Sequence, residues 1–167
     1  MPMYHDAQRV LQREFLATAD PSGQPTCSYK GGEPGFIAVP DPGTIIFPWY
    51  DGNGMFLSAG NVAAASPVGI LLIDFEAGKR LRIEGDAVLW RDPVALRAWP
   101  GALFLMRVAV GRVYPNCPRY IHHYQLVERS AFVPHAGVVP PVPAWKRAEW
   151  AADVLPKGDP ARLPGPP

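Results

Sequence analysis

The sequence predicts a mainly β protein, an antiparallel barrel or sandwich with a few short helices. Short runs rich in β-branched and aromatic residues recur along the chain, and turn residues separate them at spacings of roughly 8–12 positions. Helical segments are few and short, and strands do not alternate with long crossover helices as they do in a dinucleotide-binding fold. No internal repeat is visible, so a chain of 167 residues is expected to form one domain around one core.

The first third of the chain is expected to form a helix followed by two hairpins. Asp6 precedes the segment AQRVL, which predicts a short capped helix over residues 5–13. Runs of strand-forming residues then alternate with proline- and glycine-rich turns. The predicted hairpin strands are 15–20, 26–30, 36–39 and 44–47.

The longest strands are expected in the middle of the chain. Residues 68–75 are almost all apolar, which predicts a central strand. Residues 80–89 alternate charged and apolar side chains, so one face of that strand is expected to contact water. Asp92, placed before a proline, predicts the start of a short helix that reaches about Trp99. The last long strand is predicted over 103–114.

Composition and charge exclude several classes of partner. Hydrophobic residues make up 48% and charged residues 19%, as in ordinary globular proteins. The formal net charge of +1 predicts no partnership with nucleic acid or an anionic membrane. No apolar run approaches the ~18 residues of a membrane span, and the N-terminus lacks the apolar core of a secretory signal. Cys27 and Cys117 are therefore expected to be free thiols in a cytoplasmic protein.

The most informative stretch runs from Phe47 to Glu76. It begins as a strand, passes through a tight turn that contains Gly52 and Gly54, continues as a small-residue segment that reads as helical, and ends in another strand. A strand that enters a glycine-rich turn and then a helix brings several backbone N–H groups around one point. Such a point suits an anion or the polar edge of a planar ring. Strand–turn–helix units are common, so this pattern alone does not identify a ligand.

Three sequence blocks carry a more specific signal. They are TCSYKGG at 26–32, FPWYDGNGMFLSAGN at 47–61 and YPNCPRYIH at 114–122. In order and spacing they resemble the pyridoxamine 5′-phosphate oxidase-related family of FMN-binding split barrels, over roughly residues 14–134. The resemblance implies a six-stranded antiparallel split barrel of the Greek-key type. It also implies a homodimer with FMN in the cleft between the two subunits.

The C-terminal part has a different composition from the rest. We expect a split-barrel domain over residues 1–134 and a proline-rich arm and tail over 135–167, with a loosely ordered tail from Pro156 onward. Trp145 and Trp150 are expected to be buried against the domain or its dimer mate. A recognition segment for another protein is the alternative.

By the resemblance, the phosphate group of the cofactor contacts the strand at 26–30 and the helix after the glycine turn. Lys30 and Ser58 are the candidate phosphate ligands, and Asn61 lies one helical turn after Ser58. Ser28 and Tyr29 belong to the same strand as Lys30. From the residues alone, a solvated Lys30 and a helix-capping Ser58 remain the alternatives.

The resemblance places the flavin ring at the end of the strand that leads into the glycine turn. Backbone groups of that strand end would line the ring edge, and an aromatic side chain could stack on the ring. The expected contacts are Phe47, Pro48, Trp49, Tyr50, Asn53, Gly54 and Met55. Packing of Trp49 on the partner subunit and a plain glycine-rich turn are the alternatives.

A second subunit is expected to complete the site with Arg119, Tyr120 and His122. His122 and His123 are adjacent, and neighbouring side chains of a regular strand point to opposite faces, so they cannot both bind one ion. No metal site is predicted.

The resemblance implies a flavin-dependent oxidoreductase that acts on an unidentified small molecule, and it assigns no catalytic residue. Leu57 replaces the arginine expected before Ser58, and the segment 28–33 lacks the Arg-x-x-Leu-Leu-Lys motif of the oxidases. We therefore predict that this chain is not a true pyridoxamine phosphate oxidase. A non-catalytic flavin carrier or sensor and a haem- or deazaflavin-binding barrel are the alternatives.

Overall fold

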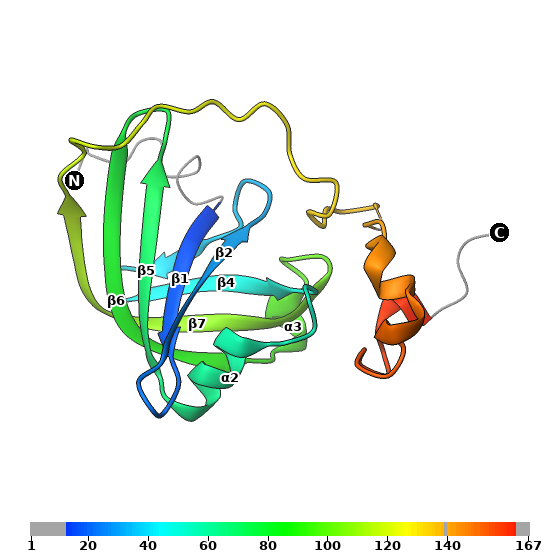
Figure 1. The fold of residues 1–167 in the computed structure, drawn as a ribbon. Helices are drawn as coiled ribbons and strands as arrows, with labels where there is room; N and C mark the ends of the chain where they lie inside the picture. Colours follow the sequence, from blue (N-terminus) through cyan, green and yellow to red (C-terminus); the bar gives the residue numbers. More distant parts are fainter. Residues whose placement is uncertain (1–12, 139, 163–167) are drawn as a thin grey trace.

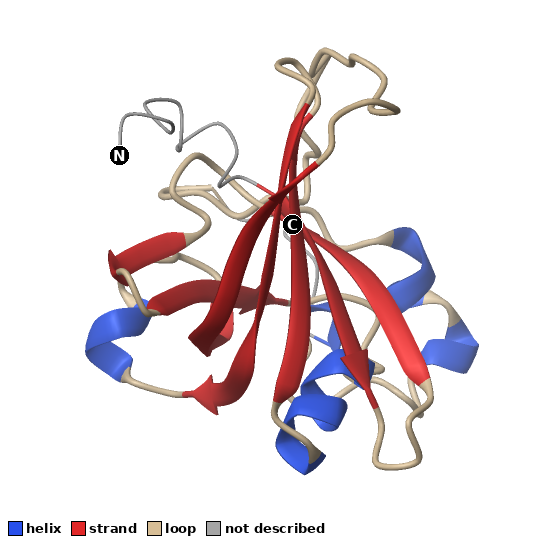
Figure 2. Ribbon diagram, turned by 90° about the vertical axis from the view of Figure 1, so that its left-hand side faces the viewer, coloured by secondary structure: helices blue, strands red, loops and turns tan. Residues whose placement is uncertain are grey.

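A seven-stranded antiparallel sheet with the strand order β2-β1-β5-β6-β7-β4-β3 curls into a barrel (Figures 1 and 2). The computed structural model describes residues 13–138 and 140–162. The predicted helix 5–13 lies outside the described residues except for Arg13, which begins the first strand. The strands are β1 (Arg13–Ala19), β2 (Pro25–Gly31), β3 (Ala38–Asp41), β4 (Thr44–Tyr50), β5 (Pro67–Asp74), β6 (Lys79–Trp90) and β7 (Ala102–Asn116).

The predicted antiparallel split barrel is confirmed, with seven strands in place of six. Strand β3 overlaps the predicted strand 36–39 but is displaced by two residues; it has only four residues and lies at the edge of the sheet beside β4. Strands β5, β6 and β7 follow one another as neighbours, and β4 lies on the far side of β7. This arrangement of β4 to β7 is a Greek key.

The two longest strands, β6 and β7, bend at a bulge between Glu84 and Gly85. Beyond the bulge a side chain at position 85 has no room, because a Cβ there would lie 2.2 Å from the carbonyl oxygen of Ala109 on β7. Bulges bend strands and increase their twist. The bend allows β6 to pair with β5 through Lys79–Asp86 while β7 pairs with β4 through Ala102–Ala109.

The core fills the barrel with the inward side chains of every long strand. β1 shows the alternation clearly, because Glu14, Leu16 and Thr18 are buried and Ala17 between them is exposed. The core side chains include Leu16, Phe36, Ile45, Phe47, Trp49, Val68, Ile70, Leu72, Ile83, Phe104, Met106 and Val108.

Two short helices flank the barrel, α2 (Leu57–Ala64) and α3 (Pro93–Leu96). α2 contributes Ala59 and Val62 to the core. Asp92 caps α3 as predicted, because its Oδ1 accepts a hydrogen bond from the amide of Val94 at 2.8 Å. The helix ends at Leu96 rather than near Trp99.

After β7, residues 117–134 cross the top of the barrel without forming a helix or strand, as the yellow segment of Figure 1 shows. The chain then forms a small C-terminal lobe, residues 144–162, which contains the 3₁₀ turns η1 (Ala144–Arg147), η2 (Glu149–Ala151) and η3 (Pro160–Arg162). No helix in the described part of the chain is long and apolar enough to span a membrane.

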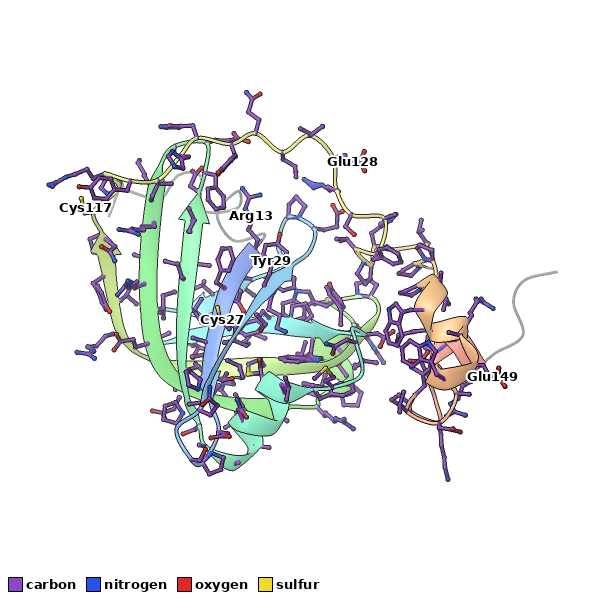
Figure 3. The ribbon with its side chains drawn as sticks, viewed as in Figure 1. Arg13, Cys27, Tyr29, Cys117, Glu128 and Glu149 are labelled. Carbon is purple, nitrogen blue, oxygen red and sulfur yellow. The ribbon has the colours of Figure 1, made fainter. Side chains whose placement is uncertain are left out.

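A buried lysine holds the C-terminal lobe to the barrel. The ammonium of Lys146 donates to Asp51 at 2.5 Å and to Asp159 at 2.7 Å. Asp159 is itself buried, so the expected loose tail from Pro156 is folded as far as Arg162. Trp145 and Trp150 stack on each other, and Trp150 is 65% exposed, so it is not buried against its own domain; burial against a dimer mate stays a prediction. The side chains of the lobe are drawn at the right of Figure 3.

Candidate functional site

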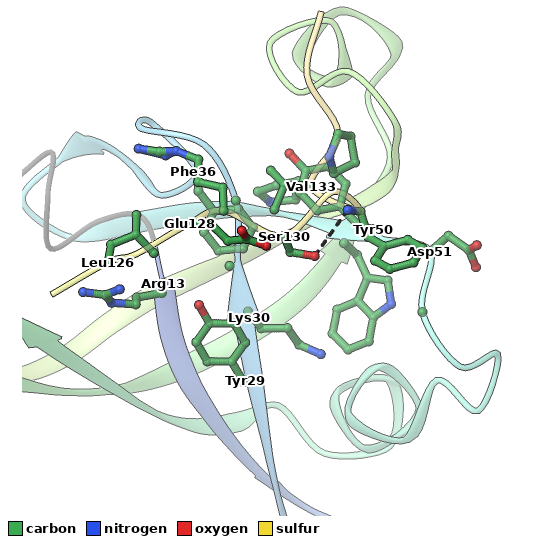
Figure 4. Close-up of a pocket in the computed structure, with 18 residues that line it drawn as sticks. Arg13, Tyr29, Lys30, Phe36, Tyr50, Asp51, Leu126, Glu128, Ser130 and Val133 are labelled. Atoms are coloured by element: carbon green, nitrogen blue, oxygen red, sulfur yellow. Dashed lines mark hydrogen bonds between the residues drawn. The ribbon is translucent and has the colours of Figure 1, made fainter. Parts of the chain in front are cut away.

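A pocket of about 510 Å³ opens between the ends of β2 and β4 and the facing segment 126–134 (Figure 4). Its volume lies in the range of small-molecule sites. Aromatic and cationic side chains dominate its lining. They are Tyr29, Phe36, Trp49, Tyr50 and Phe132, with Arg13, Lys30 and Arg129 as the cations.

The end of β2 presents a cation to the pocket. The Nζ atom of Lys30 lies 3.9 Å from the ring centroid of Trp49, a cation–π contact between β2 and β4. Burial lowers the pKa of Lys30, and the neighbouring Glu14 partly opposes this effect. Tyr29, on the other face of β2, packs edge-on against Phe15 with ring centroids 5.8 Å apart.

The end of β4 forms an aromatic wall that packing holds in place. Trp49 stacks on Phe104 with ring centroids 5.5 Å apart and an interplanar angle of 14°. Tyr50 packs against Phe36 at 6.0 Å. Burial, with a smaller contribution from Glu33, raises the pKa of Tyr50 to about 12, so its phenol is neutral at physiological pH. A planar apolar ligand would meet preformed aromatic surfaces here.

A buried carboxyl lies next to this pocket. Glu14 is fully buried, pairs with Lys30 across β1 and β2, and neither of its carboxyl oxygens has a hydrogen-bond partner. Burial raises the pKa of Glu14 to about 8, although the Lys30 ammonium acts in the opposite direction. The carboxyl is therefore mostly protonated at neutral pH.

A cluster of hydroxyl groups connects α2 to the first hairpin. The Oγ atoms of Ser28 and Ser58 are 3.3 Å apart, although the two residues are separated by 30 positions. Asn61 donates from Nδ2 to the Oγ1 of Thr18 at 3.0 Å. Thr18 Oγ1 and Thr26 Oγ1 are 3.0 Å apart. This cluster fixes the start of α2 against the strand that carries Lys30.

Ser58 does not cap the helix. The N-cap position is Phe56, which has a positive φ of 52° and makes no capping side-chain hydrogen bond. A left-handed conformation is costly for an aromatic residue. The backbone turn before α2 is therefore tightly constrained, and Ser58 lies buried in the first turn with its hydroxyl directed to Ser28.

The glycine-rich turn before α2 makes its own internal contacts. The Oδ1 of Asn53 accepts a hydrogen bond from the amide of Met55 at 3.1 Å, and Gly54 has a φ of +75°. Met55 is 61% exposed. Asp51, the first residue of the turn, lines the pocket and binds Lys146 of the C-terminal lobe.

The structure gathers some of the predicted site residues and separates others. Tyr29, Lys30, Pro48, Trp49 and Tyr50 line the pocket. Ser28, Ser58 and Asn61 form the adjacent hydroxyl cluster. Phe47 is fully buried in the core, so its side chain faces no pocket. Within this chain Arg119, Tyr120 and His122 do not line the pocket and are exposed.

Sequence reasoning missed Arg13, Glu14, Phe36 and the wall formed by segment 126–134. For Glu14 a signal was available, because it is in phase with Leu16 and Thr18 on one face of β1. The segment 126–134 has no periodicity that would show which way it faces.

Comparison with known proteins agrees with this fold. Residues 11–116 match the family model described as pyridoxamine 5′-phosphate oxidase. No curated protein matches the chain. The crystal structure of HupZ from Group A Streptococcus is 19% identical, with 68% of this chain and 94% of that chain covered and a TM-score of 0.52. A conserved hypothetical protein from Mycobacterium tuberculosis is 18% identical, with 71% and 86% covered and a TM-score of 0.50. At these identities the likeness shows the fold alone.

Proposed function

Because the chain belongs to the pyridoxamine 5′-phosphate oxidase family, we propose that it binds FMN at the pocket between β2 and β4 and acts as an oxidoreductase on a small molecule. One observation carries the proposal. An ammonium, that of Lys30, stands over an aromatic ring inside a pocket of small-molecule size. This combination suits a ligand that has both a flat ring system and an anionic group.

The residues present fit the requirements of FMN. A phosphate dianion needs charged or hydroxyl donors, and the Lys30 ammonium has no hydrogen bond or ion pair within the described part of the chain. The hydroxyls of Ser28 and Ser58 bond weakly to each other at 3.3 Å and do not line the pocket, so Lys30 is the candidate donor that faces it. Tyr50 is partly exposed and offers flat apolar surface, whereas Trp49 is buried between Phe104 and the Lys30 ammonium. When bound, the flavin would supply the hydride or electron transfer, and the protein its position and electrostatic environment.

Homodimer formation is part of the proposal. Large apolar side chains are exposed along the segment that follows β7, among them Tyr120 at 83% and Val127 at 95%. Burial of such residues against a second copy would be favourable. The second copy would bring Arg119, Tyr120 and His122 to the cofactor. We also propose a cytoplasmic location, in keeping with two free, exposed cysteines.

Vitamin B6 oxidation is not proposed. Leu57 occupies the start of α2, where the oxidases have their phosphate arginine, and its side chain is 52% exposed. A carrier or sensor that holds flavin without turnover is the second candidate, because the resemblance assigns no catalytic residue. A haem or deazaflavin ligand on the same barrel is the third.

The decisive experiment is an absorbance scan of the purified protein followed by titration of the apo form with FMN. We expect saturable binding at about one FMN per chain. A Soret band would indicate haem instead, and no saturation would contradict the proposal. Turnover with NAD(P)H and an electron acceptor would separate an enzyme from a carrier.

Lys30→Ala tests the assigned phosphate contact. Loss of a charge-assisted hydrogen bond should weaken FMN binding by ~1.5–3 kcal/mol. Lys79→Ala is the matched control, because Lys79 is exposed at the start of β6, away from the pocket lining. An unchanged dissociation constant for Lys30→Ala would remove Lys30 from the site.

A further inference from the structure

The carboxyl of Glu14 and the ammonium of Lys30 are neighbours that do not form an ion pair. They occupy paired positions on β1 and β2. Glu14 is fully buried with both oxygens unpartnered, while the Lys30 Nζ lies over Trp49, at the pocket. An ionised carboxylate in such a place is strongly unfavourable unless it gains a partner. The observed geometry is thus the one expected for a neutral Glu14.

Lys30 can adopt a second position. Directly opposite residues of an antiparallel pair have Cβ atoms about 5 Å apart, and the lysine side chain is long and flexible. Once Glu14 loses its proton, the ammonium is the nearest charge able to compensate it. In the observed position the ammonium lies over Trp49 and makes no hydrogen bond to Glu14, so contact with an ionised Glu14 requires the ammonium to move from that position.

We propose that Glu14 is a positioning residue for anion binding at the pocket. When the Glu14 carboxyl is neutral, the Lys30 ammonium is free to contact a phosphate group. When the carboxyl is ionised, it attracts the ammonium away from the pocket. The inference rests on the proposed function only in taking FMN as the phosphate-bearing ligand. Binding of FMN is then coupled to retention of one proton on Glu14.

The pH range in which FMN binding should change follows from the surroundings of Glu14 and Lys30. Burial places the pKa of Glu14 at about 8. None of the other ionisable groups on the neighbouring elements hydrogen-bonds to Glu14. These groups are Arg13 on β1, Cys27 and Tyr29 on β2, Glu33 after β2, Tyr50 and Asp51 at the end of β4, Asp74 at the end of β5, and Glu128 and Arg129 on the facing segment. None of them is a histidine, and the one thiol among them, that of Cys27, is exposed opposite Ala17 on the face of the hairpin away from Glu14.

The test compares FMN dissociation constants at pH 7, 8 and 9 for the full-length wild type, Glu14→Gln and Glu14→Leu. The FMN phosphate is a dianion over this range. The wild type should bind about tenfold more weakly at pH 9 than at pH 7, because only the protonated fraction of Glu14 permits tight binding. Both variants should show little change. Identical pH profiles for the three proteins would overturn the inference.

A measurement without ligand separates this inference from the proposed function. The protein is labelled at glutamate carboxyl carbons and lysine side chains and titrated by NMR. The resonance that is absent in Glu14→Gln should titrate near pH 8, and the Lys30 signals should shift at the same pH. If neither the wild type nor the two variants bind FMN at any pH, the proposed function fails. The NMR titration without ligand then decides the inference on Glu14. A Glu14 carboxyl that titrates near the ordinary value of 4.5 would overturn it.

Discussion

Two buried ionisable residues, Glu14 and Lys146, have opposite surroundings. Lys146 is 3% exposed and contacts two carboxylates, whereas Glu14 is fully buried and contacts none. An ion pair of this kind compensates the loss of hydration, and an isolated carboxyl compensates it only by keeping its proton. Lys146 with its two carboxylates therefore stabilises the folded state at neutral pH, and the isolated Glu14 destabilises it.

Replacement of Glu14 should change how stability depends on pH. Its pKa is about 8 when folded and near 4.5 when unfolded, so between these values the unfolded state releases a proton that the folded state keeps. The wild type therefore loses free energy of unfolding as the pH rises from 4.5 to 8, by on the order of 3–5 kcal/mol. Glu14→Leu should abolish this loss.

Urea denaturation of both proteins at a series of pH values measures the difference. Contributions of other groups cancel in the comparison, because the two proteins differ only at position 14. Parallel curves for the two proteins would show that Glu14 has an ordinary pKa.

At the scale of elements, α2 connects the hydroxyl cluster to the core. Asn61→Ala removes the donor that binds Thr18 and should lower the free energy of unfolding by ~1–3 kcal/mol. Asn53→Ala is the matched control, because Asn53 is exposed and bonds only within its own turn. Its effect should stay within about 0.5 kcal/mol. Chemical denaturation measures both, and equal effects would contradict the role of Asn61.

A pair of glycine substitutions tests the backbone at α2 and at the β6 bulge. Gly60 lies within α2 with open space around it, so Gly60→Ala should stabilise the protein by ~0.5–1 kcal/mol through helix propensity. Gly85→Ala would place its Cβ 2.2 Å from the Ala109 carbonyl oxygen and should cost ~1–3 kcal/mol or more. Thermal unfolding of the two variants should shift in opposite directions, and shifts of the same sign would be inconsistent with the bulge described above.

The sequence predicted the elements well because their signals are local. The apolar run of β5 and the alternation of β6 follow directly from which faces are buried. β3 begins and ends two residues later than the predicted strand 36–39, because a four-residue edge strand has a weak local pattern. α3 ends at Leu96 because the chain passes into a succession of tight turns. In these turns the indole of Trp99 donates a hydrogen bond to the carbonyl oxygen of Phe36 at 3.1 Å. That contact spans 63 residues, and no local pattern reveals it.

The candidate site was predictable only where family resemblance indicated it. The resemblance indicated Lys30 and Ser58 as phosphate candidates and Ser28 as a site residue on the strand of Lys30, and the structure places Ser28 and Ser58 within hydrogen-bond distance. It did not indicate the neutral Glu14 behind them. Burial of a charged residue depends on packing by distant strands, so periodicity alone suggests it without establishing it.

At the scale of the whole molecule, one lysine connects the C-terminal lobe to the rim of the pocket. Burial alone would lower the pKa of Lys146, but hydrogen bonds to Asp159 and Asp51 raise it above its usual value. The same bonds hold the pKa of Asp159 below its usual value, despite its burial. The pair therefore contributes stability above pH 3.8, and this contribution is lost as the pH falls through the lowered pKa of Asp159.

Lys146→Met should release the lobe from the barrel, because Asp159 would be left buried without a counter-charge. We expect faster tryptic cleavage at Arg147, while the barrel fragment keeps its resistance. Lys157→Met, at an exposed position of the same lobe, is the control and should leave the cleavage rate unchanged. Equal rates for the two variants would show that Lys146 does not hold the lobe.

The stacked pair of Trp145 and Trp150 also provides an optical signal. Their ring centroids are 5.9 Å apart and their planes differ by 13°, so the excited states of the two indoles couple. Such coupling produces a paired positive and negative band in circular dichroism that neither chromophore shows alone. Folding of the lobe can thus be followed by its own spectroscopic signature, independently of the β-sheet, and Trp150→Ala should remove that signature while the sheet signal persists.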